Sequence, residues 1–418
     1  MSNVASSGDF DLSGELPVGV GGSAAAEFGP LVRRFAKTFG NRRGAGAGLS
    51  VHLHGAPLVE IWTGSAGNTP WTKDTGSIIF SATKGVTATV IHRLADRGLL
   101  DYAAPMAEYW PEFGANGKAG ITVRQVMTHR AGLSALSPIA SGLEILDHQL
   151  MEERLAAAKP DHLLGVPAYH ALTYGWLLAG LARAITGDGM AELFRTEVAE
   201  PLGIDGIHLG RPPASAPTSY AELAGNQLRP IGNPLTAKVL GFSYGIPGAL
   251  GAAARCLFLP GVEAILEGEN PPILSTELAA GNGVGTASAL ATMYGALANN
   301  GTTDGRQYLS PRTIKALRRI ESYRLDHALF YAPMLWHLGY HSMPMPGAHA
   351  GLGHIGLGGS FGWAEPRLGL SVGFVHNRLS VGQLTLDQSS AAWLLPMVLA
   401  GLRSTRRAAA VVETPEAA

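Results

Sequence analysis

Strand-like periodicity occurs at both ends of this chain, around a long helical middle. Residues 48–54 and 58–63 alternate apolar and polar side chains on either side of a Gly-Ala-Pro turn, which predicts an antiparallel hairpin. A period of two returns near the C-terminus, at residues 336–341, 353–355, 360–364 and 370–375. Because strands have to pair, we expect the two ends of the chain to form one antiparallel sheet.

Helical patterns fill most of the region between the strands. Helices are predicted at residues 25–39, 83–97, 122–129, 142–157, 171–186, 190–199, 287–299 and 389–402. The expected fold class is α/β of the α+β type, in which helices flank an antiparallel sheet and a mainly helical domain is inserted. We predict a lead-in at 1–24, a sheet domain at 25–100 and 281–403, a helical and irregular inserted domain at 101–280, and a disordered tail at 404–418.

The composition indicates a large globular protein without a nucleic-acid or membrane partner. Hydrophobic residues make up 46% of the 418 residues and charged residues 15%, which allows a sizeable core. Lys and Arg number 31 against 32 Asp and Glu, so no basic surface for nucleic acid is indicated. The N-terminus lacks a signal-peptide pattern, and no apolar run reaches the ~20 residues of a membrane span. We expect a cytoplasmic protein with a small-molecule substrate, and the sequence indicates no particular oligomeric state.

The sequence indicates neither a metal nor a cofactor. Cys256 is the one cysteine, so no internal disulfide can form. The 14 histidines are scattered, and His52 and His54 lie two apart on a predicted strand without a third ligand beside them. We interpret those two as surface polar residues. No phosphate-binding glycine loop precedes a suitable helix.

The first motif with chemical potential is Ser81-Ala82-Thr83-Lys84, at the predicted junction of a short strand and a helix. Residues three apart on a helix share one face, so the Lys84 amine could hydrogen-bond the Ser81 hydroxyl. A serine hydroxyl needs a base within reach to act as a nucleophile, and a desolvated neutral lysine can be that base. The same four residues also suit an ordinary helix start with a capping serine. The preceding strand favours the catalytic interpretation.

Two further motifs could complete such a site. Tyr169, in the run Pro167 to Trp176, has a phenol that could carry a proton if nearby cations stabilise its phenolate. Taken alone, a tyrosine of this kind is far more often a half-buried packing residue. Tyr174 competes for this role, but we assign it to the core of the following helix. The run from His354 to Ser360 is rich in glycine, which lets backbone approach a substrate and could offer an N–H to an oxyanion.

These segments, in this order, resemble the β-lactamase-like serine hydrolases, a group that includes class C β-lactamases, DD-peptidases and family VIII esterases. The resemblance covers most of the chain. It extends to three other blocks, ITVRQVMTHRAGL at 121–133, GNGVGTA at 281–287 with LANNG at 297–301, and GSFGWAEP at 359–366.

The resemblance implies a role for each motif residue. Ser81 would be the nucleophile, Lys84 its partner, and Tyr169 the residue that relays a proton to and from the leaving group. His354 and Gly356 would match the first and third positions of the K-T-G-like motif and contact substrate. The backbone N–H groups of Ser81 and Leu357 would form the oxyanion hole.

Two departures from the class C pattern shape the predicted activity. Ala171 stands where those enzymes have Asn, and His354 stands where they have a Lys that holds a substrate carboxylate. Histidine is neutral for much of the time near pH 7, which favours uncharged esters. We predict a serine carboxylesterase for short-to-medium acyl chains. A β-lactamase or D-aminopeptidase-type amide hydrolase, an acyltransferase, and a catalytically silent binding protein like the penicillin-binding proteins are the alternatives.

A different nucleophile is also possible from the sequence. Two G-x-S-x-G strings contain Ser243 and Ser360, and residues 237–240 could be the strand before a nucleophile elbow at Ser243. Asp326 and His354 follow as available partners. The elbow belongs to a fold with alternating parallel strands and helices, and the first 230 residues do not show that alternation.

Overall fold

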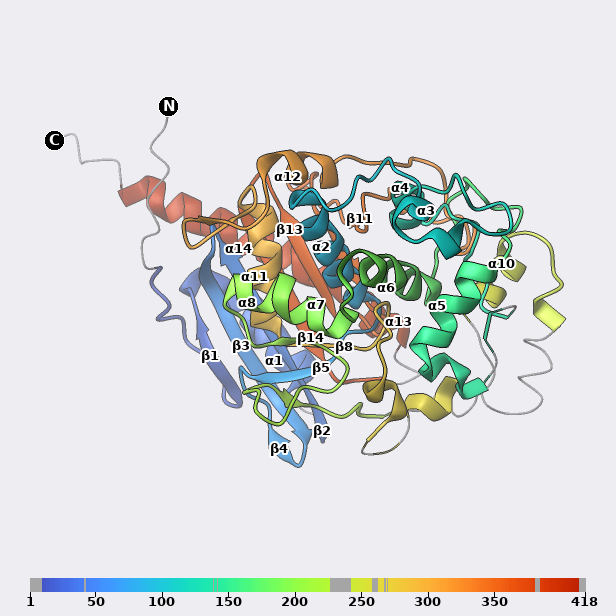
Figure 1. The fold of residues 1–418 in the computed structure, drawn as a ribbon. Helices are drawn as coiled ribbons and strands as arrows, with labels where there is room; N and C mark the ends of the chain where they lie inside the picture. Colours follow the sequence, from blue (N-terminus) through green and yellow to red (C-terminus); the bar gives the residue numbers. More distant parts are fainter. Residues whose placement is uncertain are drawn as a thin grey trace.

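An antiparallel sheet joins the two ends of the chain in the computed structural model, as predicted (Figure 1). The structure describes residues 10–40, 43–137, 139–140, 142–225, 242–257, 262–266, 268, 270–379 and 384–412. The strands of the large sheet run in the order β1 (Val20–Ala24), β3 (Ala56–Gly67), β2 (Gly44–Leu53), β14 (Leu370–His376), β13 (Phe361–Glu365), β12 (Leu352–Ile355) and β11 (His341–Ser342), with β4 (Thr69–Pro70) on the end of β3. The β2–β14 pair, with Leu49 opposite Phe374, connects the N-terminal hairpin to the C-terminal strands.

Helices cover both faces of this sheet. Leu49 and Phe374 belong to a buried cluster with side chains of α1 (Gly29–Phe39) and α14 (Ser390–Val412). On the opposite face lies α11 (Ala287–Ala298), packed against β2, β13 and β14. The contact is close because a Cβ atom at position 373 would lie 2.0 Å from the Ala287 carbonyl oxygen, so only glycine fits there.

The remaining elements lie mostly in the middle of the sequence. A second sheet has the order β6 (Ile207–Leu209), β8 (Gly283–Gly285), β5 (Thr75–Ile78) and β7 (Ser219–Tyr220), and β9 (Thr302–Thr303) pairs with β10 (Arg306–Gln307). The other helices are α2 (Thr83–Asp96), α3 (Met106–Tyr109), α4 (Val123–Met127), α5 (His148–Ala157), α6 (Thr173–Thr186), α7 (Met190–Leu193), α8 (Glu200–Leu202), α10 (Ala249–Leu257), α12 (Pro311–Leu317) and α13 (Leu384–Gln388). Short 3₁₀ turns lie at 26–28, 80–82, 111–114, 142–146, 262–266 and 272–275, and a π turn lies at 194–199.

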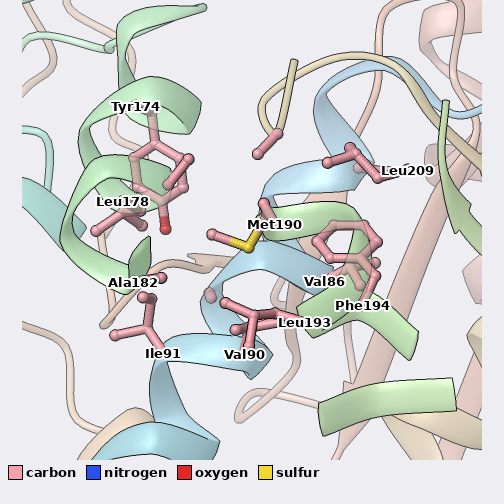
Figure 2. Close-up of a cluster of buried hydrophobic side chains, with 14 of the residues drawn as sticks. Val86, Val90, Ile91, Tyr174, Leu178, Ala182, Met190, Leu193, Phe194 and Leu209 are labelled. Carbon is pink, nitrogen blue, oxygen red and sulfur yellow. The ribbon is translucent and has the colours of Figure 1, made fainter. Parts of the chain in front are cut away.

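Helix α2 is buried against α6, and this contact fixes the helix that follows the Ser81 motif. Figure 2 shows Val86, Val90 and Ile91 of α2 facing a cluster that includes Leu178 of α6. Tyr174 is fully buried in the same cluster, which confirms its assignment to the core. None of the described helices is long and apolar enough to cross a membrane.

Several local predictions were wrong. Residues 336–340 form no strand, and only Trp336 among them makes isolated bridges, because Leu335 and Gly339 adopt left-handed backbone angles of +50° and +79°. The lead-in contains strand β1, and the expected disordered tail continues as helix α14 to Val412. His52 is buried, and its ring hydrogen-bonds Ser50 and lies 3.8 Å from the Glu60 carboxylate, so it is not a surface residue.

Candidate active site

The Ser81 motif lies where β5 gives way to α2. Between them is the 3₁₀ turn 80–82, and the Ile79 N–H donates to the Gly283 carbonyl of strand β8. Phe80 has φ of +45°, an unusual conformation for a bulky residue immediately before Ser81. The side chain of Ser81 is half-buried, whereas Lys84 in the first turn of α2 is fully buried. The sharp turn therefore leaves the hydroxyl at the edge of the core.

The Lys84 amine has three oxygen neighbours. Its Nζ lies 3.2 Å from Ser81 Oγ, and it donates to the carbonyl oxygens of Ala171 at 2.6 Å and Ala280 at 2.9 Å. A neutral amine has two N–H donors and one lone pair. With the two N–H groups directed to the carbonyls, the lone pair is left facing the Ser81 hydroxyl. This is the orientation that a base needs to remove the hydroxyl proton.

Burial decides the charge of this lysine. Desolvation lowers the pKa of Lys84 from its ordinary value to about 7. The two carbonyl acceptors act against this lowering of the pKa, because they also stabilise the charged ammonium form of Lys84. With a pKa of about 7, a substantial fraction of the protein has a neutral amine near neutral pH.

The Tyr169 segment belongs to no helix or strand, yet its backbone is fixed by distant groups. The Ala168 N–H donates to the His129 carbonyl at 2.9 Å, and the Tyr169 N–H donates to Asp326 Oδ1 at 3.0 Å. The His170 N–H donates to His129 Nδ1 at 3.1 Å. Three consecutive N–H groups are therefore satisfied by residues from other parts of the chain.

The carbonyl side of the segment is held in the same way. Cys256 of α10 donates its thiol hydrogen to the Tyr169 carbonyl, and Lys84 donates to the Ala171 carbonyl. The bond from Lys84 joins this segment directly to the Ser81 motif. No signal in the sequence pointed to the contributions of His129, Asp326 or Cys256 at this place.

The Tyr169 side chain reaches the Ser81 motif. Lys84 Nζ lies 4.9 Å from the centre of the tyrosine ring, and Ser81 is close enough to influence the pKa of the phenol. Burial raises the pKa of Tyr169, and this effect outweighs the lowering caused by the neighbouring Ser81. Tyr169 is therefore a phenol at neutral pH, a proton donor rather than a resident base.

The third segment approaches from the sheet. A Cβ atom at Gly356 would lie 2.1 Å from the Ile79 carbonyl oxygen, so glycine is required where the end of β12 meets the turn before Ser81. The following residue, Leu357, is exposed, and its backbone N–H has no hydrogen-bond partner within the described chain. Both N–H groups expected of the oxyanion hole thus belong to neighbouring segments.

His354 lies on β12 and is buried. Its Nδ1 lies 3.1 Å from the Ile355 carbonyl, and its Nε2 has no partner among the described residues. Burial, followed by the nearby His341 and Lys84, holds the pKa of His354 well below its ordinary value. The side chain is therefore uncharged at pH 7.

The competing serines have different surroundings. Ser243 lies in a helical turn, and the strand predicted before it at 237–240 lies outside the described residues. Ser360 is buried, and its hydroxyl accepts the His376 N–H. Among the described residues, the hydrogen bond given for the Ser360 hydroxyl involves neither a lysine nor a tyrosine.

A nucleophile-like serine with a buried lysine and a phenol, between a sheet and a helical region, defines a serine hydrolase of the β-lactamase-like class. The family model described as Beta-lactamase matches residues 31–392, and the chain belongs to this family. The esterase/beta-lactamase LipL of Mycobacterium tuberculosis is 52% identical over 361 residues, which are 86% of this chain and 83% of that protein.

Solved structures show the same relationship. A family VIII carboxylesterase is 30% identical, with a TM-score of 0.74, over 90% of this chain and 99% of that one. A penicillin-binding protein homologue from Caulobacter crescentus is 28% identical, with a TM-score of 0.73 and the same coverage. The fold and family expected from the sequence are confirmed.

Proposed function

We propose that this protein hydrolyses uncharged carboxylic esters through an acyl-enzyme on Ser81. The observation that carries the proposal is the placement of Lys84, whose Nζ lies 3.2 Å from Ser81 Oγ and donates to two backbone carbonyls. A buried lysine with a pKa of about 7 is suited to accept a proton near neutral pH.

Acylation begins at Ser81. Its Oγ attacks the ester carbonyl carbon while its proton passes to Lys84 Nζ, and the carbonyl electron pair moves to oxygen. The N–H groups of Ser81 and Leu357 hold that oxyanion. When the C=O bond re-forms, the C–O bond to the alcohol breaks and the alcohol takes a proton from the Tyr169 phenol. The Lys84 ammonium then returns a proton to Tyr169.

Deacylation reverses these roles with water in place of the alcohol. Water attacks the acyl carbon, and its proton passes to the neutral Lys84 or through Tyr169 to it. The bond to Ser81 Oγ breaks, Oγ regains the proton, and the carboxylic acid leaves. An alcohol in place of water would give a new ester, so acyl transfer is the second activity open to the same intermediate.

His354 supports the preference for uncharged substrates. A β-lactam carries a carboxylate, and a buried neutral imidazole offers it no charge partner at this position. The protein with 52% identity is called an esterase/beta-lactamase, so weak β-lactam hydrolysis is the alternative to compare. The proposed substrates are esters with short-to-medium acyl chains, and Gly356 and His354 are proposed to contact the substrate.

The test is covalent labelling followed by a substrate panel. A fluorophosphonate should modify Ser81, as identified by peptide mass spectrometry, and Ser81→Ala should lose both the label and all turnover while it keeps its circular dichroism spectrum. Ser243→Ala is the matched control and should keep both. p-Nitrophenyl esters of rising chain length should be cleaved far faster than a chromogenic cephalosporin. Labelling at Ser243, or esterase activity retained by Ser81→Ala, would contradict the proposal.

A further inference from the structure

Asp326 is a buried carboxylate surrounded by neutral donors. Its Oδ1 accepts the backbone N–H groups of Tyr169, Ala328 and Leu329, each at 3.0 Å, and its Oδ2 accepts the indole N–H of Trp336 at 2.9 Å. The side chain has no solvent exposure. Burial raises the pKa of Asp326, and the four hydrogen bonds oppose this effect and leave the carboxylate one orientation.

Trp336 connects this carboxylate to the tyrosine ring. Its ring lies parallel to that of Tyr169, with centroids 5.8 Å apart and planes 5° from each other. His129 also packs on Trp336. The two rings meet in an edge-type contact, with their centroids 4.2 Å apart. Asp326 thus holds the Tyr169 backbone with one oxygen, and with the other it holds the ring that packs on the Tyr169 side chain.

We propose that Asp326 and Trp336 form a positioning pair that keeps the Tyr169 phenol directed at Ser81. This inference rests on the proposed function, in which Tyr169 transfers protons to and from the leaving group. The pair touches no reacting atom. Its effect is geometric, because a displacement of about 1 Å in a proton-transferring group can lower a rate about 100-fold.

The chemistry of the Asp326–Trp336 bond gives a specific test. Asp326→Asn preserves the size and one acceptor oxygen, but its amide N–H₂ must face either the indole N–H or the backbone N–H groups, and two donors repel. Trp336→Phe removes the indole donor. In the double variant the amide N–H₂ can face the phenyl ring, so part of the kcat that Asp326→Asn loses should be recovered. A loss caused only by weaker folding would not be recovered by a second core substitution.

The measurements are kcat and KM for a p-nitrophenyl ester, corrected for the folded fraction. Asp326→Asn should lower kcat by about 10- to 100-fold and change KM less than about threefold, because positioning acts on the reacting step. The double variant should exceed Asp326→Asn in kcat. Glu365→Gln is the matched control, since Glu365 is a fully buried carboxylate that accepts two backbone N–H groups away from the site, and its kcat should be unchanged.

A Tyr169→Phe background separates this inference from the proposed function. If Tyr169→Phe alone keeps full activity, the proposed function fails. If Tyr169→Phe is impaired, Asp326→Asn should cost little more in that background, because the residue it positions is already gone. A full additional loss in that background, or no recovery in the double variant, overturns the inference. If Asp326→Asn does not fold, Trp336→Phe is compared in the same two backgrounds with the same expected outcomes.

Discussion

The Ser81 motif and the Tyr169 segment are joined by the hydrogen bond from Lys84 to the Ala171 carbonyl, but they are built in different ways. Ser81 and Lys84 lie three positions apart at a strand–helix junction, where regular backbone hydrogen bonds set their relative geometry. Tyr169 lies in a stretch without helix or strand, held by side chains of His129, Asp326 and Cys256. The proposed nucleophile and base are therefore a local motif, whereas the proposed proton donor is positioned by tertiary structure.

This difference predicts how each region responds to damage. A helix or strand is held in place by many hydrogen bonds. The loss of one core contact behind α2 should therefore lower the stability of the protein before it changes the geometry of the site. The Tyr169 segment depends on a few side-chain bonds, each worth only about 0.5–3 kcal/mol net, so the loss of one can move the residue without unfolding the protein. Substitutions in the two regions should therefore separate stability from rate.

The largest effect should come from Lys84→Met in the local motif. The substitution removes the proposed base but keeps an apolar stem of similar length, so kcat should fall by about 1000-fold or more while the fold persists. Steady-state kinetics and thermal unfolding check both parts. Lys118→Met is the matched control, because Lys118 is also buried and donates to two carbonyls, of Ala115 and Ala158, away from Ser81. A similar loss of kcat in the control would show that burial of a lysine, not its position, matters.

The pH dependence should sharpen the role of the same lysine. Because burial lowers the pKa of Lys84 to about 7, the active amine form is present above that pH and is lost as the pH falls through it. We expect kcat/KM for an uncharged ester to fall about tenfold for each pH unit well below 7 and to level off above it. A pH–rate profile between 5 and 9 measures this. A flat profile across pH 7 would assign the base role elsewhere.

His129→Leu should disturb the Tyr169 segment, which is held by tertiary contacts. It removes the acceptor of the His170 N–H and the ring that meets Trp336, so we expect kcat to fall about tenfold and the free energy of unfolding to fall by about 1–3 kcal/mol. Leu178→Ala is the counterpart behind α2 (Figure 2) and should cost about 2–5 kcal/mol of stability with an unchanged kcat per folded molecule. Chemical denaturation and kinetics on the same samples compare the two. Equal losses of kcat would erase the distinction between the regions.

Cys256→Ala should have the smallest effect. The thiol is a weak donor, and four other tethers on residues 168–171 remain, so kcat should stay within about threefold of the parent. The thiol is fully buried, and burial raises its pKa to about 12, so alkylating reagents should leave the native protein active. Intact-mass measurement after iodoacetamide, followed by an activity assay, checks this. Rapid loss of activity on alkylation would mean that the Tyr169 segment opens readily.

Much of the fold could be predicted from periodicity. The hairpin at 48–63, the return of strands near the C-terminus and the helices at 83–97 and 287–299 all carry patterns that regular burial imposes. The same rule failed at 336–340, where alternating residues form no regular strand because left-handed turns at Leu335 and Gly339 interrupt the pairing. The prediction of a disordered tail at 404–418 was also wrong, because a polar, Ala-rich end can continue a helix that is anchored at its other end.

The sequence by itself determined the sheet of two chain ends and the Ser81–Lys84 pair, because each follows from residues a few positions apart on a regular element. Tyr169 was chosen through the resemblance to a family, and its setting was decided by the tertiary structure. Hydrogen bonds between this irregular backbone and the side chains of Asp326, His129 and Cys256 leave no repeating pattern along the chain. Periodic burial is recorded in the order of residues, whereas a single contact between distant coils exists only once the chain has folded.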